Sequence, residues 1–77
     1  MQQYASGETV RLGDRVRLGQ DGNGLVVCVI DTSEYAPGFP ALDWSYLETG
    51  VLIEFPVHGL IHYKYVEPDV AFISRSA

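Results

Sequence analysis

The stretch that most constrains the fold of this chain is residues 51–65, VLIEFPVHGLIHYKY. Apolar side chains occupy every second position on both sides of its centre, which is the pattern of two half-buried β-strands. The residues between them, Pro56 to Gly59, begin with proline and end with glycine, as tight turns often do. The sequence therefore predicts an antiparallel hairpin. Because an isolated hairpin is at best marginally stable in water, the rest of the chain must cover its apolar face.

The two faces of this hairpin set its expected register. A three-residue loop, 57–59, with Gly59 in the left-handed region, keeps apolar residues opposite apolar residues. A two-residue loop, 58–59, would slip one strand by one residue and place apolar side chains opposite polar ones. We therefore expect the cross-strand pairs Phe55–Ile61, Ile53–Tyr63, Val51–Tyr65, Glu54–His62 and Leu52–Lys64.

The remaining sequence favours an all-β protein. With 77 residues the chain forms a single domain, 1–77, and we expect residues 1–8 to be frayed and 75–77 to be a tail. Eight glycines and four prolines separate short apolar runs, which indicates many turns and short strands. The most apolar run, 25–30 (LVVCVI), predicts a central strand buried on both faces. It holds the one cysteine, Cys28, so no internal disulfide can form, and we expect the thiol to be a small core side chain.

These signals add up to five short strands, at 15–18, 25–30, 51–55, 60–65 and 70–74. A turn loop is expected at 20–24, one long loop at 31–50 with a short helical turn at 43–47, and a 3₁₀-type turn at 66–69. This is the layout of a small five-stranded SH3-like barrel.

One segment of the chain also resembles a known family. The residues that carry the resemblance are Gly13-Asp14-Arg15-Val16-Arg17-Leu18, Gly22, Gly24, Val26 and Val27. This pattern is similar to the KOW-type motif of small barrels in ribosomal and transcription proteins, and the similarity covers residues 13–30. It implies the strand–loop–strand of such a barrel and an RNA- or ribosome-associated role. The family's RNA binders usually carry lysines in and around the central loop, which is residues 20–24 here and contains no lysine.

The charge balance favours a different partner. Ten Asp and Glu stand against five Lys and Arg, so the net charge is −5, whereas a nucleic-acid binder normally has a basic footprint. An acidic excess suits a basic protein surface or peptide. The first ten residues lack the pattern of a signal peptide, and no apolar run approaches the roughly 20 residues of a membrane span. We therefore expect a cytoplasmic protein that does not bind a membrane.

The segment 31–50, DTSEYAPGFPALDWSYLETG, gives the strongest functional signal. Loops of this length are uncommon unless they are functional or disordered, and its four aromatic residues argue against disorder. Its acidic and aromatic residues alternate without any Lys or Arg, a composition that suits hot-spot contacts with a cationic partner. The expected partner-binding residues are Glu34, Tyr35, Phe39, Asp43, Trp44, Tyr46 and Glu48. The alternative, that these rings only cap the open barrel and extend a small core, stays open.

The sequence offers little support for catalysis or metal binding. His58 and His62 are four residues apart, but on a hairpin they and Glu54 make at most a poor metal site, so we expect a cross-strand Glu54–His62 pair. No catalytic triad or phosphate-binding glycine motif can be assembled. We therefore expect a non-enzymatic interaction module without metal or cofactor, one form of which is a bacterial immunity or adaptor protein. The alternative is a KOW-like RNA- or ribosome-associated barrel, and the oligomeric state is left open.

Overall fold

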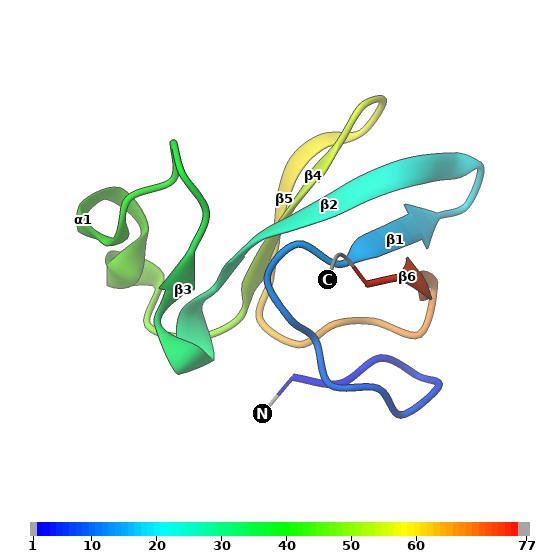
Figure 1. Ribbon diagram of the computed structural model, residues 1–77, viewed down its shortest axis with the longest axis horizontal. Coiled ribbons are helices and arrows are strands. Elements are labelled where there is room, and N and C mark those ends of the chain that lie inside the picture. The colour runs from blue at the N-terminus through cyan, green and yellow to red at the C-terminus, as the bar shows by residue number, and fades with distance from the viewer. Residues whose placement is uncertain (1, 76–77) are drawn as a thin grey trace.

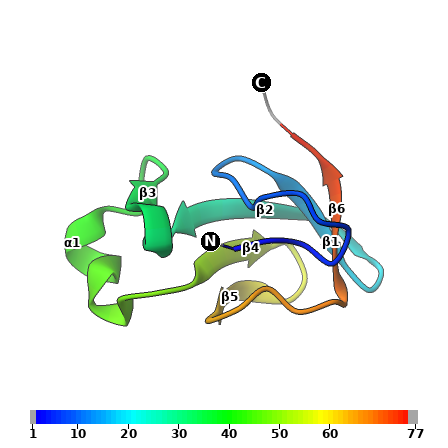
Figure 2. The same cartoon turned by 90° about the horizontal axis from the view of Figure 1, so that it is seen from below.

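The computed structural model describes residues 2–75, which fold around one antiparallel β-sheet (Figures 1 and 2). The strands are β1 (Arg15–Leu18), β2 (Asp21–Val29), β3 (Glu34–Tyr35), β4 (Val51–Phe55), β5 (Gly59–Tyr63) and β6 (Val70–Ser74). They lie in the order β5-β4-β2-β1-β6, and β3 pairs separately with β2. The short helices are η1 (Ile30–Thr32), α1 (Ala41–Trp44) and η2 (Ser45–Leu47). The all-β prediction is confirmed, with six strands in place of five because a two-residue strand forms inside the long loop.

Strand β2 is longer than the sequence pattern indicated. The predicted loop at 20–24 is wrong, because Asp21 already pairs with Leu18 and only Gly19 and Gln20 form the turn. Gly19 has a φ of 62°, which glycine adopts without strain. Further along, the register against β4 shifts between Val26 and Cys28, which is a β-bulge.

This bulge explains why two consecutive side chains of β2 lie on the same face of the sheet. Val26 and Val29 belong to the main core on the inner face, whereas Val27 and Cys28 belong to a second apolar cluster on the outer face. Strict alternation would have placed Val27 and Cys28 on opposite faces. The prediction of a strand buried on both faces is confirmed.

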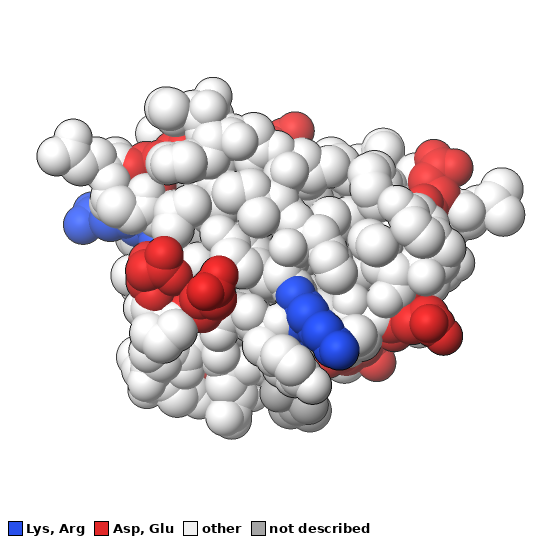
Figure 3. Space-filling model, turned by 180° about the vertical axis from the view of Figure 1, so that it is seen from behind, with Lys and Arg blue, Asp and Glu red and all other residues white. Residues whose placement is uncertain are grey.

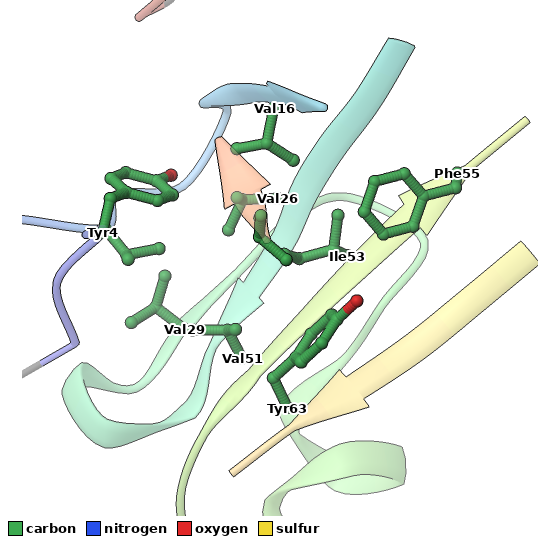
Figure 4. Packing of buried hydrophobic residues seen from close by; sticks show 10 residues of the cluster. Tyr4, Val16, Val26, Val29, Val51, Ile53, Phe55 and Tyr63 are labelled. Atoms are coloured by element: carbon green, nitrogen blue, oxygen red, sulfur yellow. The ribbon is translucent and has the colours of Figure 1, made fainter. Parts of the chain in front are cut away.

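The main core is closed by the N-terminal segment. Figure 4 shows the rings of Tyr4, Phe55 and Tyr63 around the apolar side chains of β2 and β4. The expectation that residues 1–8 are frayed does not fit this arrangement for the described residues 2–8, since Tyr4 is buried and its hydroxyl donates to Asp14 over 2.7 Å. Gln2 is also buried, and its side-chain amide donates to the carbonyl oxygen of Lys64 over 2.8 Å. A small sheet leaves part of its inner face open, and this segment covers it.

The C-terminal segment is also tied to the core. Arg75, which we expected to begin a tail, donates from Nε to Oδ1 of the fully buried Asp14 over 2.9 Å. Residues 76–77 of the expected tail lie outside the described residues. The carboxylate of Asp14, the residue before β1, therefore binds both Tyr4 and Arg75, which lie near the two ends of the described chain.

The β4–β5 hairpin forms as predicted, but its register differs by two residues. The observed pairs are Val51–Tyr63, Leu52–His62, Ile53–Ile61, Glu54–Leu60 and Phe55–Gly59. The expected Glu54–His62 pair and the 57–59 loop are therefore wrong, and the loop is 56–58. A shift by two residues leaves every side chain on its predicted face. The positive φ expected at Gly59 is confirmed at 84°.

Asp21, far from this hairpin in sequence, accounts for the register. Its Oδ2 accepts hydrogen bonds from the backbone N–H groups of Val57 over 2.9 Å and His58 over 3.1 Å. The same oxygen lies 3.0 Å from Nδ1 of the His58 ring. These contacts hold both residues in the turn, so that β5 begins at Gly59.

Candidate functional site

The two ends of the segment 31–50 are held together at the base of the sheet. The N–H of Ile30 donates to the carbonyl oxygen of Gly50 over 2.8 Å, and the N–H of Gly50 donates to Oδ1 of Asp31 over 2.6 Å. The Asp31 carboxylate also accepts hydrogen bonds from the Thr49 hydroxyl and the Gln2 amide. Burial by itself would raise the pKa of Asp31, but these hydrogen bonds outweigh it and lower that pKa. The segment is therefore a compact loop whose ends are fixed.

Three of its aromatic rings pack inward. Tyr35, Phe39 and Trp44 are partly buried against the second apolar cluster, which consists of Val27, Cys28, Ile30 and Leu52. The centroids of the Phe39 and Trp44 rings lie 6.4 Å apart, within the range of favourable aromatic pairs. This packing on the outer face of β2 and β4 is what the capping alternative predicts for these three rings.

The helical part of the segment presents two other side chains to solvent. The helical turn expected at 43–47 begins two residues earlier, with α1 at Ala41, and continues through η2 to Leu47. Leu42 is 92% exposed and Tyr46 is 71% exposed, whereas Trp44 and Leu47 pack toward the second cluster. Tyr46 was among the predicted site residues, and Leu42 was not. Leu42 lies four residues before Tyr46 on a helical turn, and this spacing is the sequence signal that would have identified Leu42.

The segment that carries these exposed side chains also carries acidic residues. Asp43 and Glu48 are exposed, while Glu34 is partly buried and accepts a hydrogen bond from the Thr32 hydroxyl over 2.6 Å. Figure 3 shows acidic atoms, and no basic ones, toward the end of the molecule that this segment forms, on the right of that view. We call the surface formed by Leu42, Asp43, Tyr46 and Glu48 the outer loop face.

Glu48 has an unusual backbone conformation. Its φ is 67° and its ψ is −37°, and the N–H of Thr49 donates to the carbonyl oxygen of Leu47 over 2.7 Å. This i to i+2 hydrogen bond makes a γ-turn of the rare, strained type. A residue other than glycine at such a position costs of order 1–3 kcal/mol. Glu48 therefore occupies this position at a cost to the stability of the fold.

The two histidines and the one cysteine contact other groups of the fold. His58 contacts Asp21, and Nε2 of His62 lies 2.9 Å from the carbonyl oxygen of Thr49. Within residues 2–75, no three His, Cys, Asp or Glu side chains come together as metal ligands would. Cys28 is fully buried, and this burial raises the pKa of its thiol.

None of the helices between residues 2 and 75 has the length and apolar character needed to cross a membrane. Comparison of the chain with known protein families, with curated proteins and with solved structures finds no match.

Proposed function

We propose that this protein is a small, non-enzymatic interaction module whose outer loop face binds a basic protein surface. The observation that carries this proposal is the exposure of Leu42 and Tyr46, at 92% and 71%, on a helical turn whose other side is anchored in the fold. Exposed apolar side chains rimmed by polar groups are typical of protein-binding sites. Tyrosine is also among the residues that most often act as interface hot spots.

The geometry of the loop supports binding with little loss of conformational entropy. Its ends are held by Asp31, and the inward rings of Phe39 and Trp44 fix the helical turn on the sheet. A surface that is already ordered before binding avoids part of the entropic cost of association. The strained γ-turn at Glu48 agrees with this role, because strain concentrates at functional positions.

The charge of the outer loop face supports a basic partner. Asp43 and Glu48 are exposed on the outer loop face, and the segment 31–50 contains no Lys or Arg. Opposite charges on the partner would speed the encounter and exclude acidic competitors. A bacterial immunity or adaptor protein that covers a basic surface is one concrete form of this function.

The strand order also supports a finer proposal about the fold. The pairing of β6 with β1, beside β2, agrees with a small SH3-like barrel.

A second candidate function, an RNA- or ribosome-associated barrel, is favoured by one observation. Arg15 and Arg17 are both exposed on β1, next to the turn that carries the KOW-like pattern. Phosphate contacts from these arginines would give an affinity for RNA that falls steeply with salt. A filter-binding titration at low and high salt tests this function, and the variant Arg15→Ala/Arg17→Ala should then weaken binding.

Affinity capture with two tyrosine variants tests the main proposal. Tyr46→Ala removes the exposed ring of the outer loop face, and Tyr65→Ala is its control, because Tyr65 is 70% exposed elsewhere. We expect a basic protein to be recovered with the wild type and with Tyr65→Ala. Tyr46→Ala should bind the same protein about 30-fold more weakly in calorimetry, equivalent to the roughly 2 kcal/mol of a hot spot. Equal binding by both variants would exclude the outer loop face.

A further inference from the structure

A groove of about 370 Å³ lies on the outer face of the sheet, near the β4–β5 turn, and includes none of the predicted site residues. Leu25 of β2 contributes to its floor and also packs against the second apolar cluster, so the groove is continuous with the surface that supports the loop. Glu54 of β4 and Leu60 of β5 contribute to one side of it, and Arg15 of β1 contributes to the other.

The strand pairing places these four side chains in one row across the sheet. Glu54 lies opposite Leu60 on one side and Leu25 on the other, and Leu25 lies opposite Arg15. Because neighbouring strands are about 4.8 Å apart, the backbone positions of Glu54 and Arg15 are separated by roughly 10 Å. A carboxylate therefore stands between two leucines, and the arginine stands two strands away.

Neither charged group of this row is neutralised inside the protein. The ion pairs formed among residues 2–75 join His58 to Asp21 and Arg75 to Asp14, and include neither Glu54 nor Arg15. Glu54 is exposed, and Leu60 beside it is 41% exposed. A carboxylate between the exposed Leu60 and the partly buried Leu25 presents one negative charge and two surfaces for methylene groups.

We propose that this groove receives a lysine or arginine side chain of the partner. The alkyl stem would lie on Leu25 and Leu60, and the cationic end would pair with Glu54, which is how long basic side chains bury their stems while their charge stays paired. Arg15 repels a cation from the opposite side of the groove and so directs it toward Glu54. The inference deepens the proposed function, because it assumes the basic partner inferred for the outer loop face and adds a second contact that selects one side chain.

Glu54 is favoured over Arg15 as the recognition group because of the neighbours of each. Both cross-strand neighbours of Glu54 are leucines, whereas Arg15 has Leu25 on one side and Ser74 on the other. The two leucines offer apolar surface on both sides of the Glu54 carboxylate, which suits the alkyl stem of a long basic side chain. A carboxylate ligand bound by Arg15 is the competing occupant.

The groove can be tested without knowing the partner, by NMR titration with three small probes. The probes are N-acetyl-lysine methylamide, its uncharged analogue N-acetyl-norleucine methylamide, and N-acetyl-glutamate methylamide. With the lysine probe, we expect saturable shifts of the backbone amide signals of Leu25, Glu54 and Leu60. The norleucine probe should bind up to about fivefold more weakly, because it has the stem without the charge that pairs with the exposed Glu54.

Two matched variants then identify the charged group. Glu54→Gln should weaken binding of the lysine probe up to about fivefold, as expected for an exposed ion pair, whereas Glu67→Gln, the same change at an exposed position outside the groove, should leave it unaltered. Equal shifts with the norleucine probe, an unaltered affinity in Glu54→Gln, or stronger binding of the glutamate probe would each overturn the proposal. Because the probes do not involve Tyr46, these results are independent of the capture experiment, and either proposal can fail alone.

Discussion

Replacing Trp44 with alanine should destabilise the fold far more than replacing Tyr46, although both belong to the same helical segment. Trp44 packs against the second apolar cluster and the Phe39 ring, whereas Tyr46 is 71% exposed. For a partly buried tryptophan we take the low end of aromatic burial, about 150 Å². At roughly 25 cal/mol per Å², its removal costs about 4 kcal/mol, within the range found for Trp→Ala changes in protein cores.

This loss is large for a domain of 77 residues, whose free energy of unfolding is expected to be roughly 4–12 kcal/mol. Tyr46→Ala should change the free energy of unfolding by less than about 0.5 kcal/mol, as is usual for exposed positions. Urea unfolding followed by far-ultraviolet circular dichroism measures both, because Trp44 is the only tryptophan and its removal abolishes that fluorescence signal. If Trp44→Ala lost less than about 1 kcal/mol, the inward packing would not stabilise the loop, and the reasoning would be refuted.

Three further predictions concern the fold that holds this site. Gly50→Ala should lower the melting temperature more than Gly59→Ala. Both positions have positive φ, but only at Gly50 would a Cβ atom lie 2.3 Å from a backbone carbonyl oxygen of β5. Equal losses of melting temperature in the two variants would contradict this prediction. Burial alone would raise the pKa of Asp21, but hydrogen bonds from the β4–β5 turn outweigh it and lower that pKa. Its stabilising contribution is therefore present above a pH of about 4 and is lost as the pH falls through the folded pKa, so Asp21→Asn should flatten the acid limb of a plot of stability against pH. Tyr4→Phe should cost about 1–2 kcal/mol in urea unfolding, because it removes the hydrogen bond to the fully buried Asp14; an unchanged free energy would show that this bond adds nothing to stability.

The parts of the fold that could be predicted from sequence depend on local patterns. Alternation of apolar residues is a property of the strand itself, so the hairpin, its two faces and the doubly buried run in β2 were predicted correctly. The positive φ of Gly59 was predicted from another local pattern, because a tight turn favours glycine, which has no Cβ atom, where φ is positive. The helical turn in the long loop was also expected, although it begins two residues earlier than predicted.

The candidate site was only partly predictable. Composition identified the segment 31–50, but composition does not distinguish a ring that faces the sheet from one that faces solvent. Trp44 was expected to be a partner-binding residue, and in the structure it is partly buried while Tyr46 and the unpredicted Leu42 are exposed. Whether a ring faces the sheet depends on where the helical turn lies over β2 and β4, which no local pattern specifies.

The sequence by itself determined the fold class, the strand faces and the acidic, aromatic character of the long loop, because these follow from the side chains of neighbouring residues. The tertiary structure alone decided how three carboxylates are used. Asp14 holds Tyr4 and Arg75, Asp21 holds the β4–β5 turn, and Asp31 holds the base of the loop, through hydrogen bonds to residues distant in sequence. The buried carboxylates of Asp14 and Asp21 must be paired with hydrogen-bond donors, and several of these donors belong to distant parts of the chain. This is why the hairpin register and the position of the N-terminal segment could not be predicted from their own residues.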